Sequence, residues 1–316
     1  MQKREHFWCT FGQRMFHARI LRYLDEVVRS GSIRKAADKL NVASSSVNRQ
    51  ILELEQDLNT PIFERLPRGL RLTAAGELLI THVRQTLRDH DRLQSRILEL
   101  RGLTRGTVKI ATMSGLASGL IPRLAIEFRS KYPGVRIVIQ SMTGDEIVKA
   151  VDEADVDFGV GHNLRSDPSI YVVEVFDARL GAIVAKDHPL ANRASVRLSD
   201  CANHPIVLAD PTISIHNMMR NAFRRSNVTL DPAYETNAIE VMKYMAIHDG
   251  AIIFLSAPDV SEEVRLGNLA YLPIADRSLK NHPLSLIQRS STSLGLAPGL
   301  FSEVVRNALR ELTKGN

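Results

Sequence analysis

The sequence has few of the features that stabilise or anchor secreted and membrane proteins. Only two of its 316 residues are cysteines, Cys9 and Cys201, which excludes a disulfide framework and makes a reducing cytoplasm the expected compartment. No apolar run approaches the roughly 20 residues of a membrane span, and the first residues lack the apolar segment of a secretory signal. We therefore expect a cytoplasmic protein with no membrane partner.

Motifs for catalysis and for metal binding are also scarce. The chain has no nucleophile elbow, no clustered metal ligands and no phosphate-binding glycine loop. Ser32 to Lys35 fits the S-x-x-K pattern of serine acyl-enzymes, but the companion motifs are missing and we treat the match as chance. The sequence thus predicts no catalytic residue, no cofactor and no bound metal.

Positive charge is distributed unevenly along the chain. Residues 1–106 contain 19 Lys and Arg against 12 Asp and Glu, whereas residues 107–316 contain 22 against 23. All of the excess behind the net charge of +6 therefore lies in the first third. A basic surface suits a polyanion, so nucleic acid is the expected partner of this part of the chain.

Residues 32–58 have the pattern of two short helices separated by a tight turn. Small apolar residues on one face mark the first helix, at residues 36–40. Asn41 suits the turn because asparagine tolerates the left-handed backbone. The apolar stripe predicted for the second helix consists of Val47, Ile51, Leu54 and Leu58.

The polar residues that begin the second helix are the candidate base-reading residues. In a helix-turn-helix, the N-terminal end of this helix meets the base edges of the major groove. Asn48 could read adenine, and Arg49 could read guanine or hold a phosphate. The predicted major-groove contacts are Ser44, Ser45, Asn48 and Arg49.

A basic hairpin is predicted next, for residues 64–73. There charged and apolar side chains alternate around a proline and a glycine. Arg68, at the tip, is expected to enter a minor groove, while Arg65 and Arg71 would touch phosphates.

One long helix is predicted for residues 74–101, ended by Gly102. Residues at alternating spacings of four and three form a mostly apolar seam along one face of this helix. Little else in this part of the chain could cover the seam, so we expect the helix to pair with a second copy of itself. The seam residues are Leu79, Val83, Thr86, His90, Leu93, Ile97 and Leu100.

From residue 107 the pattern changes to alternating strands and helices, which predicts a parallel sheet with right-handed crossovers. The expected strands are 108–112, 135–140 and 156–160, with helices around 121–128 and at 146–154. A second unit follows, with strands 180–185, 206–208 and 252–255 and helices 215–225 and 239–248. Strand 285–288 and helix 301–312 complete the chain.

The chain is expected to leave the first unit near Phe176 and to return near Pro283. Two lobes joined by two crossings make a hinged cleft that can close on a small molecule. Ligands of such sheets bind beyond the carboxyl ends of the strands. The predicted ligand-binding residues are Ser114, Gly115, Met142, Thr143, His162, Ser214 and Asn237, with Thr212 and Thr236 as further candidates.

Ser114 and Thr143 can cap helices whose backbone N–H groups would face a bound anion. The alternative is plain capping without a ligand, which is the more common role of such residues. On the first interpretation, the ligand is a small anionic metabolite such as a carboxylate.

The motifs GSIRKAADKLNV, NRQILELEQDL, PIFER and LRLTAAGE follow one another and are followed by the long helix and the strand TVKIATM. On these motifs and their order, the chain from Arg19 onward resembles LysR-type transcriptional regulators. The resemblance implies an α/β protein with an N-terminal winged helix-turn-helix, a long linker helix that forms a dimer, and a two-lobed effector domain like type 2 periplasmic binding proteins. It also implies assembly as a homotetramer and effector-controlled transcription.

The sequence departs from the family pattern at four positions. Ser44 stands where a base-reading glutamine is common, and Asn48 where serine is usual. Ala43 occupies a frequent capping position, so Ser44 could cap the helix instead, and Asn59 replaces a common glycine. These changes affect the expected DNA sequence preference and not DNA binding itself.

The expected regulator would bind double-stranded DNA and a small-molecule effector. Its phosphate contacts would be Ser32, Arg34, Lys35 and Thr73. The expected parts are an extension at 1–18, a winged helix-turn-helix at 19–75, a linker helix and hinge at 76–106, and an effector domain at 107–316, with lobe 1 about 107–176 and 283–316 and lobe 2 about 177–282. Residues 1–18 either pack on the DNA-binding domain or precede a true start at Met15.

Two other functions could use the same cleft. A solute-binding protein of a transporter would have the two lobes but no use for the basic N-terminal third. An enzyme would need the catalytic motifs that the sequence lacks.

Overall fold

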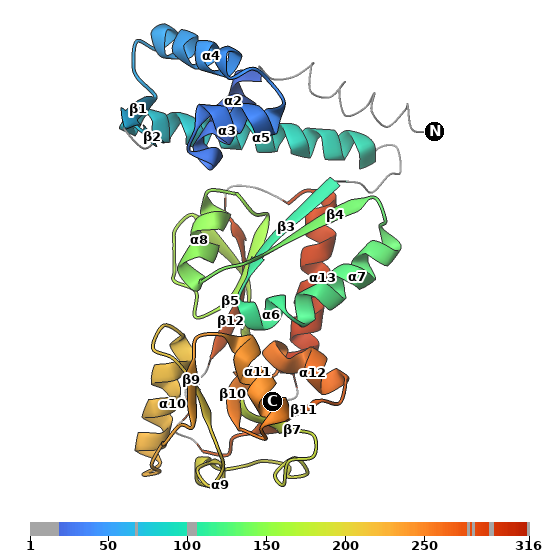
Figure 1. Ribbon diagram of the computed structural model, residues 1–316. Coiled ribbons are helices and arrows are strands. Elements are labelled where there is room, and N and C mark those ends of the chain that lie inside the picture. The colour runs from blue at the N-terminus through green and yellow to red at the C-terminus, as the bar shows by residue number, and fades with distance from the viewer. Residues whose placement is uncertain are drawn as a thin grey trace. The chain divides into compact units, whose positions relative to one another are not determined.

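The computed structural model describes residues 19–66, 69–99, 106–276, 279, 282–290 and 294–314. The chain forms two compact units, Met1–Leu103 and Thr104–Asn316 (Figure 1). The predicted extension at 1–18 and the wing-tip residue Arg68 lie outside the described residues. Among the residues that are described, no helix combines the length and the apolar character that a membrane crossing requires.

The N-terminal unit is a winged helix-turn-helix followed by a long helix, as predicted. Its elements are α2 (Arg19–Ser30), α3 (Ile33–Leu40), α4 (Ser44–Asp57), the antiparallel strands β1 (Phe63–Leu66) and β2 (Gly69–Leu72), and α5 (Ala74–Glu99). Asn41 ends α3 in the left-handed conformation at φ 54°, which confirms its predicted turn role. Asn59 has φ 48°, as expected of a residue in place of glycine.

Two local contacts fix the wing against the helices. The Glu55 carboxylate of α4 accepts hydrogen bonds from the backbone N–H groups of Ile62 at 2.7 Å and Phe63 at 3.1 Å. Gly76 in the first turn of α5 lies so close to the Ile62 carbonyl that an added Cβ would be 2.2 Å from its oxygen. Glycine is therefore required where α5 crosses this turn.

Two details of the predicted helix-turn-helix are wrong. Leu58 was expected in the buried stripe of α4, but it follows the last helical residue and is 48% exposed. Ala43, and not Ser44, occupies the N-cap position of α4, so Ser44 begins the helix with its side chain exposed. Ser32 is the N-cap residue of α3, but its hydroxyl makes no capping hydrogen bond.

The predicted α5 seam is covered partly by its own unit. Val83 is fully buried, and Leu79 packs against the same core, which contains Leu24 and Val27 of α2. This corrects the expectation that only a second copy could cover the seam. The seam residue Leu93 is 46% exposed, and the side chains of Ile97 and Leu100 lie outside those described.

Lobe 1 of the C-terminal unit is a five-stranded sheet in the order β4-β3-β5-β12-β6. The predicted parallel core is present, because β3 is parallel to β4 and β5, while β12 runs antiparallel to β5 and β6. The strands are β3 (Gly106–Thr112), β4 (Val135–Ser141), β5 (Phe158–His162), β6 (Ile170–Asp177) and β12 (Pro283–Arg289). Helices α7 (Leu120–Lys131) and α13 (Leu296–Thr313) cover one face and α8 (Gly144–Asp152) the other, with α6 (Ser114–Ala117) after β3 (Figure 1).

Lobe 2 is built on a three-stranded antiparallel sheet in the order β10-β7-β11. A parallel pair, β8 and β9, joins it through a bridge between Ile206 and Ile252. The strands are β7 (Leu180–Ala185), β8 (Val207–Ala209), β9 (Tyr234–Thr236), β10 (Ile253–Ser256) and β11 (Leu269–Pro273). The helices are α9 (Leu198–Cys201), α10 (Ser214–Arg225), α11 (Ile239–His248), the 3-10 turn η1 (Pro258–Val260) and α12 (Ser261–Arg265).

Candidate functional site

The predicted DNA-contact residues lie mainly on the surfaces of α3 and α4. Ser44, Ser45 and Arg49 are exposed on the first turns of α4, and Asn48 is half-buried. Arg49 pairs with Glu53 on the same helix, at 3.6 Å between exposed side chains. Such a pair contributes little to stability, so the guanidinium can exchange its partner for a base or a phosphate.

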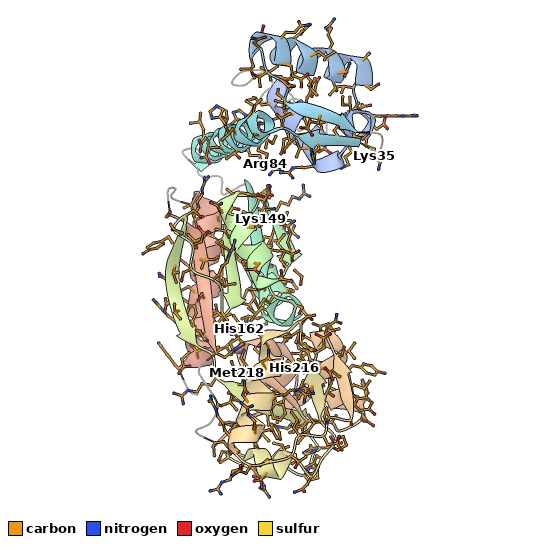
Figure 2. All side chains as sticks on the ribbon, turned by 90° about the vertical axis from the view of Figure 1, so that its left-hand side faces the viewer. Lys35, Arg84, Lys149, His162, His216 and Met218 are labelled. Carbon is orange, nitrogen blue, oxygen red and sulfur yellow. The ribbon has the colours of Figure 1, made fainter. Side chains whose placement is uncertain are left out.

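The predicted phosphate contacts differ in how available they are. Arg34 and Lys35 are exposed on α3 (Lys35 is labelled in Figure 2), whereas Ser32 is half-buried. The Thr73 hydroxyl donates to the Pro61 carbonyl at 2.7 Å and accepts the Gly76 N–H at 3.0 Å. A phosphate contact from Thr73 would therefore have to replace an internal hydrogen bond.

A cavity of about 630 Å³ lies between the two lobes of the C-terminal unit. All seven predicted ligand-binding residues line it, five from lobe 1 and two, Ser214 and Asn237, from lobe 2. Thr212 also lines the cavity, but Thr236 is not among the lining residues. The residues that meet there come from the ends of β3, β4 and β5 in lobe 1 and from α10 and the β9–α11 turn in lobe 2.

Charge within the cavity wall is mixed. Asp145 and Glu146 in the first turn of α8 line it, and Arg165 lies 3.6 Å from Asp145. Glu146 accepts both the backbone N–H and the hydroxyl of Thr143 at 2.9 Å, which lowers the pKa of its carboxyl. The cap of α8 is thus satisfied within the helix, as the plain-capping alternative for Thr143 expected. The prediction that Ser114 caps a helix is wrong, because Met113 is the N-cap residue of α6 and Ser114 begins the helix.

The sequence interpretation missed a buried acid at the base of the cavity. Asp259 of η1 is 4% exposed and lies 3.2 Å from His162 Nε2 across the lobe boundary. It also accepts the Ser256 hydroxyl at 2.6 Å. Burial alone raises the pKa of the Asp259 carboxyl, but His162 and Ser256 more than offset this and hold that pKa below its ordinary value.

A second missed residue is His282, in the crossing that returns the chain to lobe 1. Its ring stacks on His162 with centroids 4.1 Å apart. Burial, followed by the neighbouring His162, lowers the pKa of His282 to about 3, so its imidazole is neutral. Figure 2 shows His162 where the two lobes meet.

A third missed residue, Lys243 of α11, is 3% exposed and bridges the lobes, with its ammonium 3.5 Å from the carbonyl oxygen of the cavity residue Gly115. Its ammonium donates to Glu263 at 2.9 Å within lobe 2 and to the Ser118 hydroxyl at 3.0 Å in lobe 1. Asp259, Lys243 and His282 are each about 100 residues or more from the lobe 1 residues they contact, so no local spacing could have identified these contacts.

Neither catalysis nor a metal is indicated by this arrangement. Ser256, His162 and Asp259 come together, but the Ser256 hydroxyl donates to Asp259, and both groups approach the same ring nitrogen, Nε2. A catalytic triad requires the serine and the acid on opposite nitrogens of the histidine. Among the described residues, no group of histidine, cysteine and acidic side chains could hold a metal ion.

Comparison with known families matches both units of the chain. Residues 18–77 match the bacterial regulatory helix-turn-helix of the LysR family, and residues 101–310 match the LysR substrate-binding domain.

Individual relatives and solved structures agree with this match. The transcriptional regulator BenM of Acinetobacter baylyi is 30% identical, over 82% of this chain and 85% of the relative. The transcriptional activator CmpR of Synechocystis sp. is 26% identical, over 84% and 86%. Full-length CbnR in complex with its target DNA shares the fold, with a TM-score of 0.60 and 22% identity over 93% of this chain and 100% of CbnR. The chain belongs to the LysR family and is a DNA-binding transcriptional regulator with an effector-binding domain.

Proposed function

We propose that the regulator is controlled by a small molecule bound in the cavity between lobe 1 and lobe 2. One observation carries the proposal: seven residues chosen from sequence, spread from residue 114 to residue 237, line a single cavity. Its volume of about 630 Å³ falls in the range of small-molecule sites. The proposed effector contacts are Ser114, Gly115, Met142, Thr143, His162, Ser214 and Asn237.

The proposed effector is a small organic acid, and the lobe 2 side of the cavity offers one position for an anionic group. The first turn of α8 carries Asp145 and Glu146, whereas the first turn of α10 carries no acidic residue. The positive end of the α10 dipole therefore remains available to an anion beside Ser214. Effector binding can control DNA binding only if the lobes adopt two arrangements that bind the effector with different affinities.

We propose that α4 reads the major groove through Ser44, Ser45, Asn48 and Arg49, while Ser32, Arg34, Lys35 and Thr73 position phosphates. Arg68 is proposed to enter a minor groove. The exposure of the first turns of α4 supports this arrangement, as does the general use of that helix end in helix-turn-helix proteins.

We also propose a homodimer through α5 and assembly as a homotetramer. Leu78 of α5 is 77% exposed and Leu93 is 46% exposed, which leaves apolar surface on a helix that a second copy could cover. In the effector domain, Ile126 and Tyr244 are 72% and 62% exposed. L93D should shift the molar mass measured by light scattering toward a smaller assembly, and an unchanged mass would exclude this face.

The effector site can be tested by a thermal-shift screen of small organic acids on the full chain. S114A should reduce the stabilisation produced by any hit and leave DNA binding without effector intact. S130A is the matched control, because Ser130 lies on α7 and its hydroxyl donates to Glu127 on the same helix. Equal stabilisation of wild type and S114A would place the effector elsewhere.

A further inference from the structure

The stacked histidines at the base of the cavity, His162 and His282, are both incompletely hydrogen-bonded. They are 5% and 1% exposed, and both line the cavity. His162 Nε2 lies 3.2 Å from Asp259 Oδ2, and His282 Nδ1 lies 3.1 Å from Asn163 Nδ2. Among the described residues, no hydrogen-bond partner reaches His162 Nδ1 or His282 Nε2, and neither atom is open to solvent.

A buried histidine elsewhere in lobe 2 shows the usual arrangement. His216 Nδ1 lies 2.7 Å from the Ala209 carbonyl, and His216 Nε2 accepts from Arg220 Nε at 3.0 Å (His216 is labelled in Figure 2). Most buried polar atoms in proteins are paired in this way, and an exception calls for an explanation. The two unpaired nitrogens at the cavity are such an exception.

The partner of each ring defines what its other nitrogen offers. The Asn163 amide donates to His282 Nδ1, so the proton of the neutral His282 ring is on Nε2, which is a donor. On His162 the proton facing Asp259 is on Nε2, so Nδ1 accepts in the neutral ring and donates in the charged ring. The pair therefore presents one fixed donor and one nitrogen that can serve either role.

We propose that His282 Nε2 donates to a carbonyl-type oxygen of the effector, from a carboxylate or a carboxamide, and that His162 Nδ1 contacts the second heteroatom of the same group. This inference rests on the proposed effector site. Asp259 and Asn163 act as positioning residues that fix the two rings. Because both nitrogens are covered in this state, the ligand must shift their surroundings to reach them, which couples binding to the arrangement of the lobes.

Two substitutions of His282 test whether its Nε2 donor, and not the rest of the ring, holds the ligand. The amide of H282Q can reach the position of Nε2, whereas the shorter amide of H282N can replace only Nδ1. H248N is the matched control, because His248 is exposed on α11 and lies against Tyr244. Circular dichroism and DNA affinity without ligand establish that each full-length variant is folded.

The probes are butanoate, succinate and phenylacetate, each beside its carboxamide, in thermal-shift titrations. We expect at least one probe to stabilise wild type, with a half-saturating concentration about tenfold higher in H282N, as for one lost buried hydrogen bond. H282Q and H248N should stay within about threefold of wild type. Stabilisation by the acids would identify the recognised group as a carboxylate, and stabilisation by the amides would identify it as a carboxamide.

Two results would overturn the inference. The first is equal half-saturation in wild type and H282N, and the second is the failure of every probe to stabilise wild type. A probe whose effect depends on Ser114 and not on His282 would overturn this inference alone and leave the proposed effector cavity standing.

Discussion

Replacing Lys243 by methionine should destabilise the effector domain strongly. The Lys243 ammonium is 3% exposed and pairs with Glu263 at 2.9 Å, and the Glu263 side chain is 17% exposed. Methionine keeps most of the volume of the lysine stem but removes the charge, which leaves the Glu263 carboxylate without its buried counter-ion. The Ser118 hydroxyl would lose its donor as well.

The expected loss follows from the burial of the pair. Removing one partner of a buried ion pair costs about 3 kcal/mol of unfolding free energy. For a domain of this size each kcal/mol lowers Tm by about 2–4 °C, so K243M should unfold roughly 6–12 °C below wild type. Pairing K243M with E263Q should recover part of that loss, because the uncompensated charge is then gone.

The measurement is urea and thermal unfolding of full-length protein followed by circular dichroism. K149M is the matched control, because Lys149 on α8 (labelled in Figure 2) is 68% exposed and lies 3.9 Å from Glu153. An exposed pair of this kind contributes less than about 1 kcal/mol. Equal effects of K243M and K149M, or no recovery in the double variant, would refute the role of the buried pair.

Three further predictions concern other sites. Because the pKa of Asp259 is depressed, its carboxylate contributes stability that is fully present above the ordinary carboxyl pKa of about 4 and is lost as pH falls toward the native value. The difference in urea midpoint between wild type and D259N should therefore shrink between pH 6 and pH 3, and a constant difference would contradict this. Burial raises the pKa of the Cys201 thiol to about 12, so peptide mapping after thiol labelling at pH 8 should find Cys201 unmodified until the domain unfolds. Labelling of Cys201 in the native state would show that the thiol is accessible. N48A should reduce the free-energy difference between specific and non-specific DNA binding by about 1–3 kcal/mol if Asn48 reads a base. Uniform weakening on all sequences would instead assign Asn48 to a phosphate contact.

Long elements with clear ends were predictable from the sequence. Helix α11 was expected at 239–248 and β7 at 180–185, and both have those bounds. The apolar periodicity defines each element, and Gly250 ends the region of α11. Asn41 was predictable because few residues other than glycine adopt its backbone conformation.

Shorter or edge elements were missed. β6 spans Ile170–Asp177 at the edge of lobe 1, and β9 and β11 have three and five residues. The β-branched residues of β6 could have marked it as a strand. The others are too short for periodicity to define.

Tertiary partners were the least predictable part. The α5 pattern identified its apolar face, but not that α2 would cover Val83. In the cavity, Thr143 was predictable as the N-cap of α8, but Ser114 is the first residue of α6 and Met113 is its N-cap. His162 and Asp259 are 97 residues apart in sequence. Their contact depends on how lobe 2 packs against lobe 1, which no local pattern encodes.

The most direct test of the account is reciprocity between effector and DNA. Calorimetric titration should give the affinity of a cavity ligand for the full-length protein with and without its operator DNA. If cavity and DNA are coupled, DNA must change the ligand affinity by the same factor by which the ligand changes DNA affinity, typically about 5–150-fold. Ligand affinity that is identical with and without DNA would contradict the claim that the cavity controls the regulator.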